Sequence, residues 1–175
     1  MLIHVSVDLG ELFRLGKKYP WVRPVHCPKC CGIRLWSHGF VTRYFDDFEH
    51  AVWIKRYRCP DCSSVHTLRP SGYRGFTQAS NAVVLLSLLI KIIFGCYPSG
   101  ICTRRQRYWF NRFKQEICCQ KNVDFTDQSL MLKCLRSQFS IEDFSTSILL
   151  IYSWTYNVFK SLHLPFQATE SGPSP

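Results

Sequence analysis

The sequence predicts an α+β fold, in which a small ribbon of short strands built around four cysteines precedes a helical, helix-turn-helix-like region. Two C-P-x-C motifs lie where aromatic and basic residues alternate and where Gly, Asp and Pro mark turns, a pattern typical of short strands and hairpins. Two later segments, residues 77–94 and the residues from Thr103 onward, have the length and composition of helices.

The charge of the chain is strongly positive and unevenly distributed. The 175 residues include 22 Lys and Arg against 12 Asp and Glu, a formal net charge of +10. Residues 1–114 hold 18 basic and 6 acidic residues, whereas residues 115–175 hold 4 and 6. A basic surface attracts polyanions such as nucleic acid, so we expect the partner-binding surface in the first two thirds of the chain.

Composition and turn signals divide the chain into five predicted segments. With 46% hydrophobic residues the chain is expected to fold rather than stay disordered. The predicted segments are a lead-in over residues 1–24, with one short strand and a short helix or loop; a ribbon over residues 25–75; a helical pair over residues 76–120; a mainly helical segment over residues 121–166; and a disordered tail over residues 167–175.

The strongest chemical signal is the pair of motifs Cys27-Pro-Lys-Cys30 and Cys59-Pro-Asp-Cys62. Each motif places two thiolates on one tight turn, and two such turns complete a tetrahedral shell that zinc, or less commonly iron, occupies. The 28 residues between the motifs exceed the usual spacing and can hold a hairpin with arms at residues 35–45 and 51–58. We predict one structural Zn²⁺ in a zinc ribbon. A closed shell leaves no open position for substrate, so this ion stabilises the fold rather than catalysing a reaction.

Other interpretations of the cysteines and histidines remain open. A redox C-x-x-C or a disulfide pair would leave the second motif unexplained. Cys31 adjoins a ligand and is an alternative to Cys30, while His26 and His66 are expected near the metal or at the surface. The remaining cysteines show no paired spacing and are expected to be free thiols, mainly buried; they are Cys96, Cys102, Cys118, Cys119 and Cys134.

Two helices are predicted after the ribbon. Residues 77–94 read as a buried helix with Thr77 or Ser80 as N-cap, and its 13-residue apolar run from residue 82 to residue 94 is too short to cross a bilayer. The segment GCYPSG, residues 95–100, ends this helix. A second helix is predicted from Thr103, because Thr103 and Gln106 fit a capping box. Aromatic and aliphatic residues recur every fourth position on it, at Trp109, Phe113 and Ile117.

Two groups of basic residues are candidates for nucleic-acid contact. In the ribbon, basic residues interleave with aromatic ones that can stack on bases, and in the second helix arginines occupy the first turns, where a recognition helix meets DNA. The alternative for each group is a solvated face over an aromatic core. The candidates are Lys55, Arg56 and Arg58 for phosphates, and Arg104, Arg105, Arg107, Arg112 and Lys114 on the helix.

The sequence shows no phosphate-binding loop and no nucleophile with a matched base, so we predict that the chain is not an enzyme in its own right. The carboxylates Asp46, Asp47 and Glu49 cluster in a predicted turn. A nuclease that binds metal through the later carboxylates is a weaker alternative; these are Asp124, Asp127, Glu142 and Asp143.

Several strings in the ribbon carry a family resemblance. Cys27-Pro-Lys-Cys30, Ser37-His38-Gly39 and the run R-Y-R-C-x-x-C-x-x-x-H-x-L-x-P over residues 56–70 together resemble the N-terminal zinc-ribbon region of bacterial insertion-sequence transposases, and small transposase-like proteins that carry this region alone. The resemblance covers about half of the chain, residues 25–114. Beyond residue 117 the sequence resembles no family that we recognise.

The resemblance implies a zinc ribbon followed by a helix-turn-helix that binds duplex DNA at transposon ends or a related site. In full-length relatives a ribonuclease-H-like domain then supplies three carboxylates for phosphoryl transfer. The 60 or so residues after the basic helix are too few for that domain, so we expect a chain without the catalytic part. The turn at residues 95–102 looks compressed beside the family's helix-turn-helix.

Two rival classes of function follow from the same residues. One is a ribbon that docks on a transposase or polymerase partner through exposed aromatics such as Trp36 and Trp53. The other is an enzyme, either a thiol oxidoreductase or the nuclease mentioned above. With no secretory signal and no membrane-length apolar run, a cytoplasmic, bacterial location without membrane contact is expected. The oligomeric state is left open.

Overall fold

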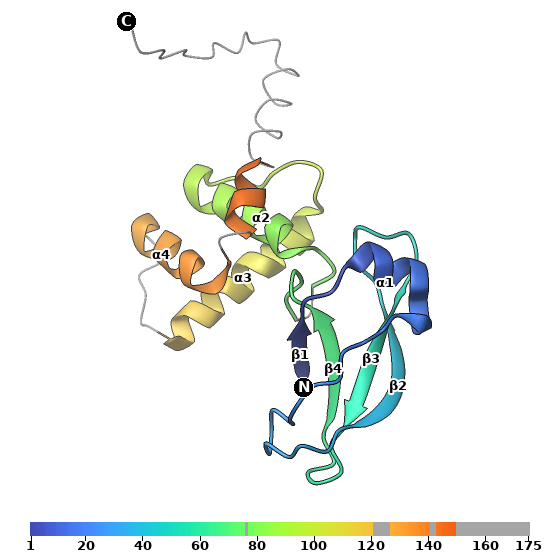
Figure 1. Ribbon diagram of the computed structural model, residues 1–175. Helices are drawn as coiled ribbons and strands as arrows, with labels where there is room; N and C mark the ends of the chain where they lie inside the picture. The colour runs from blue at the N-terminus through green and yellow to red at the C-terminus, as the bar shows by residue number, and fades with distance from the viewer. Residues whose placement is uncertain (76, 121–126, 141–142, 150–175) are drawn as a thin grey trace, which may run out of the picture. The chain divides into compact units, whose positions relative to one another are not determined.

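The computed structural model describes residues 1–75, 77–120, 127–140 and 143–149. The chain divides into two compact units, Met1–Asn81 and Ala82–Pro175. The first unit holds a four-stranded sheet and the second is helical (Figure 1). A mixed α+β fold with a cysteine-rich ribbon was predicted, and the structure confirms the mixed fold and the clustering of four cysteines.

The sheet of the first unit has the strand order β1-β4-β3-β2 (Figure 1). Strands β2 (Trp36–Arg43) and β3 (Val52–Arg58) form the antiparallel hairpin that the spacing of the cysteines predicted, with an irregularity between Ser37 and Phe40. Strand β4 (Val65–Pro70) continues the antiparallel sheet beside β3.

Strand β1 (Leu2–Val5) completes the sheet by pairing with β4 in parallel, with Leu2 opposite Thr67. The predicted short strand therefore exists. It belongs to the same unit as the cysteine-bearing segment, so the lead-in and the ribbon share one sheet. After β1 the chain forms α1 (Leu9–Leu15), which Asp8 caps through a bond from the Glu11 backbone N–H, and the short 3₁₀ helix η1 (Gly16–Lys18).

Two apolar clusters hold the first unit together. One joins Leu12 of α1 to Val52 and Ile54 of β3, with Phe45 and Tyr73. The other surrounds the cysteine region and consists of Cys27, Leu35, Tyr57, Cys59 and Leu68. Each cluster has side chains with almost no solvent exposure. Such fully buried apolar side chains contribute most to stability.

The second unit is built around α2 (Asn81–Phe94), which begins directly after Ser80. Every residue from Val84 to Ile90 is buried, as expected of a helix that is apolar on all sides and packed inside a domain. The hydroxyl of Ser147 donates to the Ala82 carbonyl at 2.8 Å, and the Gln128 amide donates to the Ile92 carbonyl at 2.9 Å, which has no donor within the helix because it lies in the last turn of α2.

Helix α3 (Thr103–Gln120) begins where the sequence predicted, and its stripe of Trp109, Phe113 and Ile117 is buried. The predicted capping box is wrong. Gln106 is fully buried and donates to the carbonyls of Pro98 and Ile101 at 3.0 and 2.7 Å, while its own oxygen accepts from Ser87 at 2.8 Å. The Gln106 side chain is drawn into the interior because the loop before α3 presents carbonyls there that need donors.

Helix α4 (Gln128–Gln138) falls within the segment predicted as mainly helical, and residues 143–149 are also helical. Asp127 caps α4 by accepting from the Leu130 N–H at 3.1 Å, and Asp143 forms a reciprocal cap with Ser140. The candidate acids Asp124 and Glu142 and all residues after 149, the predicted tail included, lie outside the described residues. Within the described part of the chain, no helix has the length and apolar character that crossing a membrane requires.

Candidate metal centre and basic surfaces

The two C-P-x-C motifs form loops at the same end of the sheet, one before β2 and one between β3 and β4 (Figure 1). The Sγ atoms of Cys27, Cys30, Cys59 and Cys62 all lie within 4.8 Å of one another. Each thiol pairs closely across the loops: Cys27 Sγ lies 3.6 Å from Cys62 Sγ, and Cys30 Sγ lies 3.5 Å from Cys59 Sγ. The sequence prediction that these four residues come together is confirmed.

These distances fit a shared metal ion rather than disulfides. A tetrahedral ion with Zn–S bonds of about 2.3 Å separates its sulfur ligands by about 3.8 Å, close to the observed 3.5 and 3.6 Å. A disulfide would bring the sulfurs to about 2.05 Å. The four side chains could therefore hold one metal ion with little movement, and thiolate donors favour zinc or iron among common metals.

The two loops have the same backbone design. In each loop the residue after the second cysteine has a positive φ angle, 59° at Cys31 and 57° at Ser63. The first loop closes through bonds from Cys27 N to the Gly32 carbonyl and from Cys31 N to the Cys27 carbonyl, both 2.8 Å. The second closes through Cys59 N and the Ser64 carbonyl at 3.0 Å. These bonds hold the backbone of each loop in the tight turn that carries its two thiols.

An ion pair joins the two loops. Arg34 donates to the carboxylate of Asp61, which lies inside the second motif. Gly32 lies against the same carboxylate, and a Cβ atom at this position would collide with Asp61 Oδ2. The glycine therefore gives Asp61 room to lie between Arg34 and the cysteines.

The neighbouring residues that the sequence left open are now placed. Cys31 is exposed and lies outside the four-thiol group, in keeping with its positive φ angle, and His26 is also exposed. His66 is fully buried, and its Nε2 atom lies 3.2 Å from Cys27 Sγ. The other ring nitrogen, Nδ1, is buried and has no hydrogen-bond partner in the described part of the chain.

Hydrogen bonds in and around the four-thiol group shift the pKa values of two of the thiols. The pKa of Cys62 falls to about 6, chiefly because the Ser64 hydroxyl and backbone N–H bond to its sulfur. The pKa of Cys30 rises to about 12, because hydrogen bonds with the other thiols and burial outweigh the opposing bond from the Gly32 backbone. Cys62 thus ionises more readily than an ordinary thiol, whereas Cys30 keeps a proton that a metal ion would displace on binding.

The remaining described cysteines correct a prediction. We expected them to be mainly buried, but Cys96, Cys102 and Cys118 are exposed and only Cys134 of those described is buried. Cys96 lies in the exposed turn after α2, Cys102 precedes α3, and Cys118 lies beside the buried stripe that ends at Ile117. Their environment follows from their position on an element, which the spacing of cysteines alone does not reveal.

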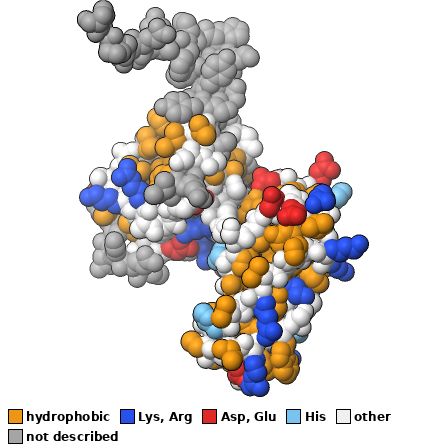
Figure 2. Space-filling model, viewed as in Figure 1, with side chains coloured by type: hydrophobic (Ala, Val, Ile, Leu, Met, Phe, Trp, Pro, Cys, Tyr) orange, Lys and Arg blue, Asp and Glu red, His pale blue; other side chains and the backbone are white. Residues whose placement is uncertain are grey.

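The basic residues of the ribbon do not form one surface. Neighbouring residues of a strand project to opposite faces, so Lys55 and Arg56 of β3 cannot contact the same partner surface. Lys55 is half-buried, with its Nζ atom 4.3 Å from the centre of the Phe40 ring. Arg56 is half-buried too, whereas Arg58 is exposed. Figure 2 shows basic side chains spread among apolar ones along the sheet-bearing unit, with most acidic side chains near one end.

The basic residues of α3 separate into two groups. Three have intramolecular partners: Arg105 lies 5.2 Å from the Trp109 ring centre, Arg112 donates to Glu116 at 3.1 Å, and Lys114 lies 5.4 Å from the Phe110 ring centre. The other two, Arg104 and Arg107, are exposed and lie three positions apart in the sequence. Residues with this spacing share one face of a helix, which continues through the exposed Tyr108 and Asn111.

Comparison of the chain with models of protein families, with curated proteins and with solved structures gave no match.

Proposed function

We propose that this protein is a zinc-dependent DNA-binding protein, transposase-like and without a catalytic domain. The four-thiol group supports the metal, because its geometry matches a tetrahedral shell and leaves no ligand position for substrate. The role of zinc is to hold the two loops of the ribbon together, so that its loss would unfold the first unit rather than remove a catalyst.

The observation that carries the DNA contact is the exposed face of α3 that begins with Arg104 and Arg107. Both guanidinium groups project from the first turns of the helix, where the backbone N–H groups add positive potential. Arginine suits this position because it can bind phosphate oxygens or the edge of guanine with two hydrogen bonds. Tyr108 and Asn111 on the same face add side chains that commonly bind phosphates and bases.

The helix-turn-helix itself is part of the proposal. Helices α2 and α3 are joined by residues 95–102, a longer connection than the turn of about three to four residues found in most such motifs. The buried Gln106 ties this connection to α2 and to the start of α3, which gives the basic face a fixed base. From the resemblance of the ribbon to transposase zinc ribbons, we further propose that the DNA is a transposon end or a related site.

The test is binding of a labelled duplex to the zinc-loaded protein, followed by fluorescence anisotropy across a salt series. Wild-type affinity should fall steeply with added salt. The double variant Arg104→Gln/Arg107→Gln should reduce the slope of log affinity against log salt by about 2, since each phosphate contact contributes about 0.9. Arg136→Gln, an exposed arginine of α4, is the matched control and should leave the slope unchanged. Salt-insensitive binding, or equal slopes, would overturn the assignment.

A second candidate function, docking on a protein partner, is favoured by one observation. Near the cysteine loops Trp36, Ile33 and Val25 are 59%, 76% and 81% exposed, an unusual concentration of solvent-facing apolar side chains. Trp53 fits docking less well, because it is 36% exposed and Lys17 lies 4.1 Å from its ring centre. Two results together would support this function instead of DNA binding. The zinc-loaded protein would bind no duplex at low salt, and a protein partner would be retained after nuclease treatment but lost on Trp36→Ser.

A further inference from the structure

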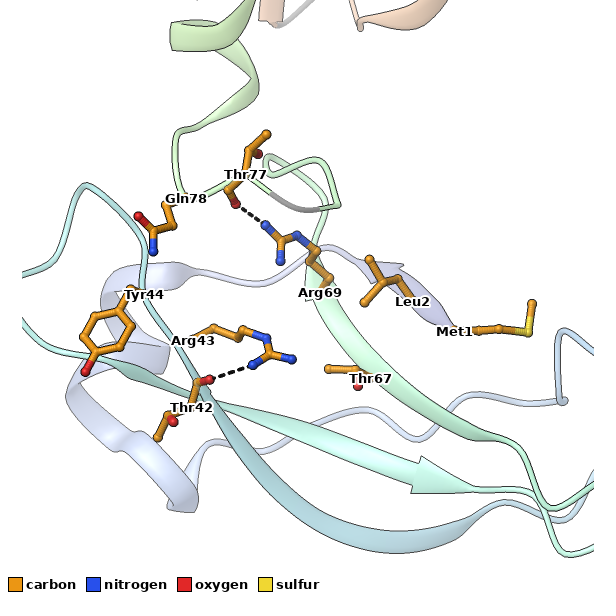
Figure 3. Close-up of a pocket in the computed structure, with 9 residues that line it drawn as sticks. All are labelled: Met1, Leu2, Thr42, Arg43, Tyr44, Thr67, Arg69, Thr77 and Gln78. Carbon is orange, nitrogen blue, oxygen red and sulfur yellow. Dashed lines mark hydrogen bonds between the residues drawn. The ribbon is translucent and has the colours of Figure 1, made fainter. Parts of the chain in front are cut away.

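A cavity of about 720 Å³ lies on the sheet of the first unit, apart from the cysteine loops (Figure 3). Strand β2 begins next to the first cysteine loop and ends at the cavity with Arg43, so the two sites lie toward opposite ends of this strand. The volume lies within the range of small-molecule sites, about 300–1,000 Å³. The lining residues come from three strands and from the segment before α2: Met1, Leu2, Thr42, Arg43, Tyr44, Thr67, Arg69, Thr77 and Gln78.

The charge of this cavity is positive and is not balanced by its own lining. Arg43 and Arg69 are the two charged side chains among the nine lining residues, and no carboxylate is among those nine. Figure 3 shows the Arg43 side chain reaching from β2 across the sheet toward Thr67 and Arg69. Two guanidinium groups that face a common space repel each other, and an anion between them would remove that repulsion.

Neutral groups hold both arginines in place. Arg69 is 7% exposed, and it donates through Nε to the Tyr73 carbonyl at 3.0 Å and through Nη2 to the Thr77 carbonyl. Arg43 donates to the Thr42 carbonyl at 3.2 Å. Burial lowers the pKa of Arg69, and the charge of Arg43 lowers it further. Since carbonyl oxygens orient a guanidinium without cancelling its charge, both groups remain available to an anionic ligand.

A third arginine adjoins the cavity in the register of the sheet. Arg56 of β3 lies directly opposite Thr67, a lining residue, and paired residues of neighbouring strands project to the same face. Its Nε atom is buried and has no hydrogen-bond partner in the described part of the chain. A buried donor of this kind usually finds an acceptor, but Arg56 is not itself among the lining residues and no contact with the ligand is assigned to it.

We propose that this cavity binds a phosphate monoester, with the phosphate between Arg43 and Arg69 and the organic part along Leu2, Tyr44 and the threonines. Arginine matches the planar oxygen pairs of phosphate, and a monoester carries a charge of about −1.5 to −2 at neutral pH, which balances two guanidinium groups. The Thr67 hydroxyl and the Gln78 amide can bond a sugar or a base, whereas the Thr77 hydroxyl already donates to the carbonyls of Arg74 and Ala79. The ligand is of nucleotide size, either free or as the 5′-phosphorylated end of a nucleic-acid strand. This proposal does not depend on DNA binding by α3.

The experiment is calorimetric titration of the zinc-loaded full chain with adenosine 5′-monophosphate, adenosine and inorganic phosphate. The monophosphate should bind, inorganic phosphate should bind more weakly, and adenosine should bind at least tenfold more weakly than the monophosphate. Arg43→Gln should weaken the monophosphate at least tenfold, while Arg14→Gln, which removes an exposed charge from α1, should change its affinity less than twofold. Arg43 is exposed, so this variant should fold, and its zinc content and circular dichroism verify that it does.

Short oligonucleotides with and without a 5′-phosphate distinguish the two sources. In both cases binding should depend on the phosphate and be abolished by Arg43→Gln. If the phosphorylated oligonucleotide binds more tightly than the free nucleotide, the site belongs to a strand end. If the free nucleotide binds more tightly, the site belongs to a free nucleotide. Adenosine binding as tightly as the monophosphate, or phosphate-dependent binding that Arg43→Gln leaves intact, would overturn the proposal. So would a folded, zinc-loaded protein that binds neither phosphorylated probe at millimolar concentration.

Discussion

The Nε2 atom of His66 lies 3.2 Å from the Sγ atom of Cys27, and both side chains are fully buried. His66 is in β4, whereas Cys27 precedes β2, so the contact links the first cysteine loop to a strand two positions away in the sheet. When Cys27 is a thiolate, the neutral imidazole can donate its Nε2 proton to the sulfur. Such a bond orients a metal ligand and stabilises its charge.

His66→Leu should lower zinc affinity by about 10- to 100-fold, the usual cost of removing a group that bonds to a metal ligand. His66→Gln, which retains an N–H donor, should recover part of the loss. The measurement is competition for zinc against a chromophoric chelator. His26→Leu is the matched control, because His26 adjoins Cys27 in sequence but is exposed. Equal affinities for His66→Leu and wild type would show that the contact contributes nothing to binding.

Backbone geometry at Ser63 leads to a second prediction. Ser63 is exposed and has a φ angle of 57°, a conformation that β-branched residues strongly disfavour. Ser63→Val should therefore lower the free energy of unfolding by about 1–2 kcal/mol, whereas Ser63→Gly should be tolerated because glycine adopts positive φ without strain. Urea unfolding of the zinc-loaded protein compares the two variants. If valine and glycine had the same effect, strain at this position would not explain the loop.

Local signals in the sequence predicted the cysteine loops, the β2–β3 hairpin and the helix starts near Ser80 and Thr103, because each depends on residues within one motif or turn. The parallel pairing of Leu2 with Thr67 could not be predicted in this way, since it joins residues that are 65 positions apart. The cavity at Arg43 and Arg69 is equally hidden, because it forms only when those strands are assembled. The interior role of Gln106 was missed because two of its partners are backbone carbonyls, which leave no trace in side-chain patterns, and the third is the hydroxyl of Ser87 on another helix.

Gln106 provides a third prediction, on the stability of the helical unit. Gln106→Leu leaves the Pro98 and Ile101 carbonyls without this donor and the Ser87 hydroxyl without its acceptor. Each buried polar group that loses its partner costs about 1–3 kcal/mol, so the free energy of unfolding should fall by at least about 2 kcal/mol. Gln115→Leu, an exposed glutamine on the same helix, should have little effect. Chemical unfolding with saturating zinc, followed by the helical signal in circular dichroism, measures both variants. A small loss in Gln106→Leu would mean that water replaces the amide.

Cys102 gives a fourth prediction, on thiol reactivity. Its pKa lies below the usual thiol value because the backbone N–H groups of Arg105 and Arg104 bond to its sulfur, with smaller contributions from the charges of the same residues. The thiolate is the nucleophile, and a lower pKa extends its presence to lower pH. Iodoacetamide should therefore alkylate Cys102 with a pH midpoint below that of N-acetylcysteine amide.

Mass spectrometry of the alkylated peptides follows Cys102 separately, while bound zinc protects the four ligand thiols. Arg104→Gln removes one charge but keeps the backbone N–H, so it should move the midpoint only part of the way toward that of N-acetylcysteine amide. Added salt screens the charges but not the hydrogen bonds, and should likewise have a small effect. If Arg104→Gln moves the midpoint all the way to that of N-acetylcysteine amide, charge causes the shift. If wild-type Cys102 already has the midpoint of N-acetylcysteine amide, the hydrogen bonds at the start of α3 do not lower its pKa.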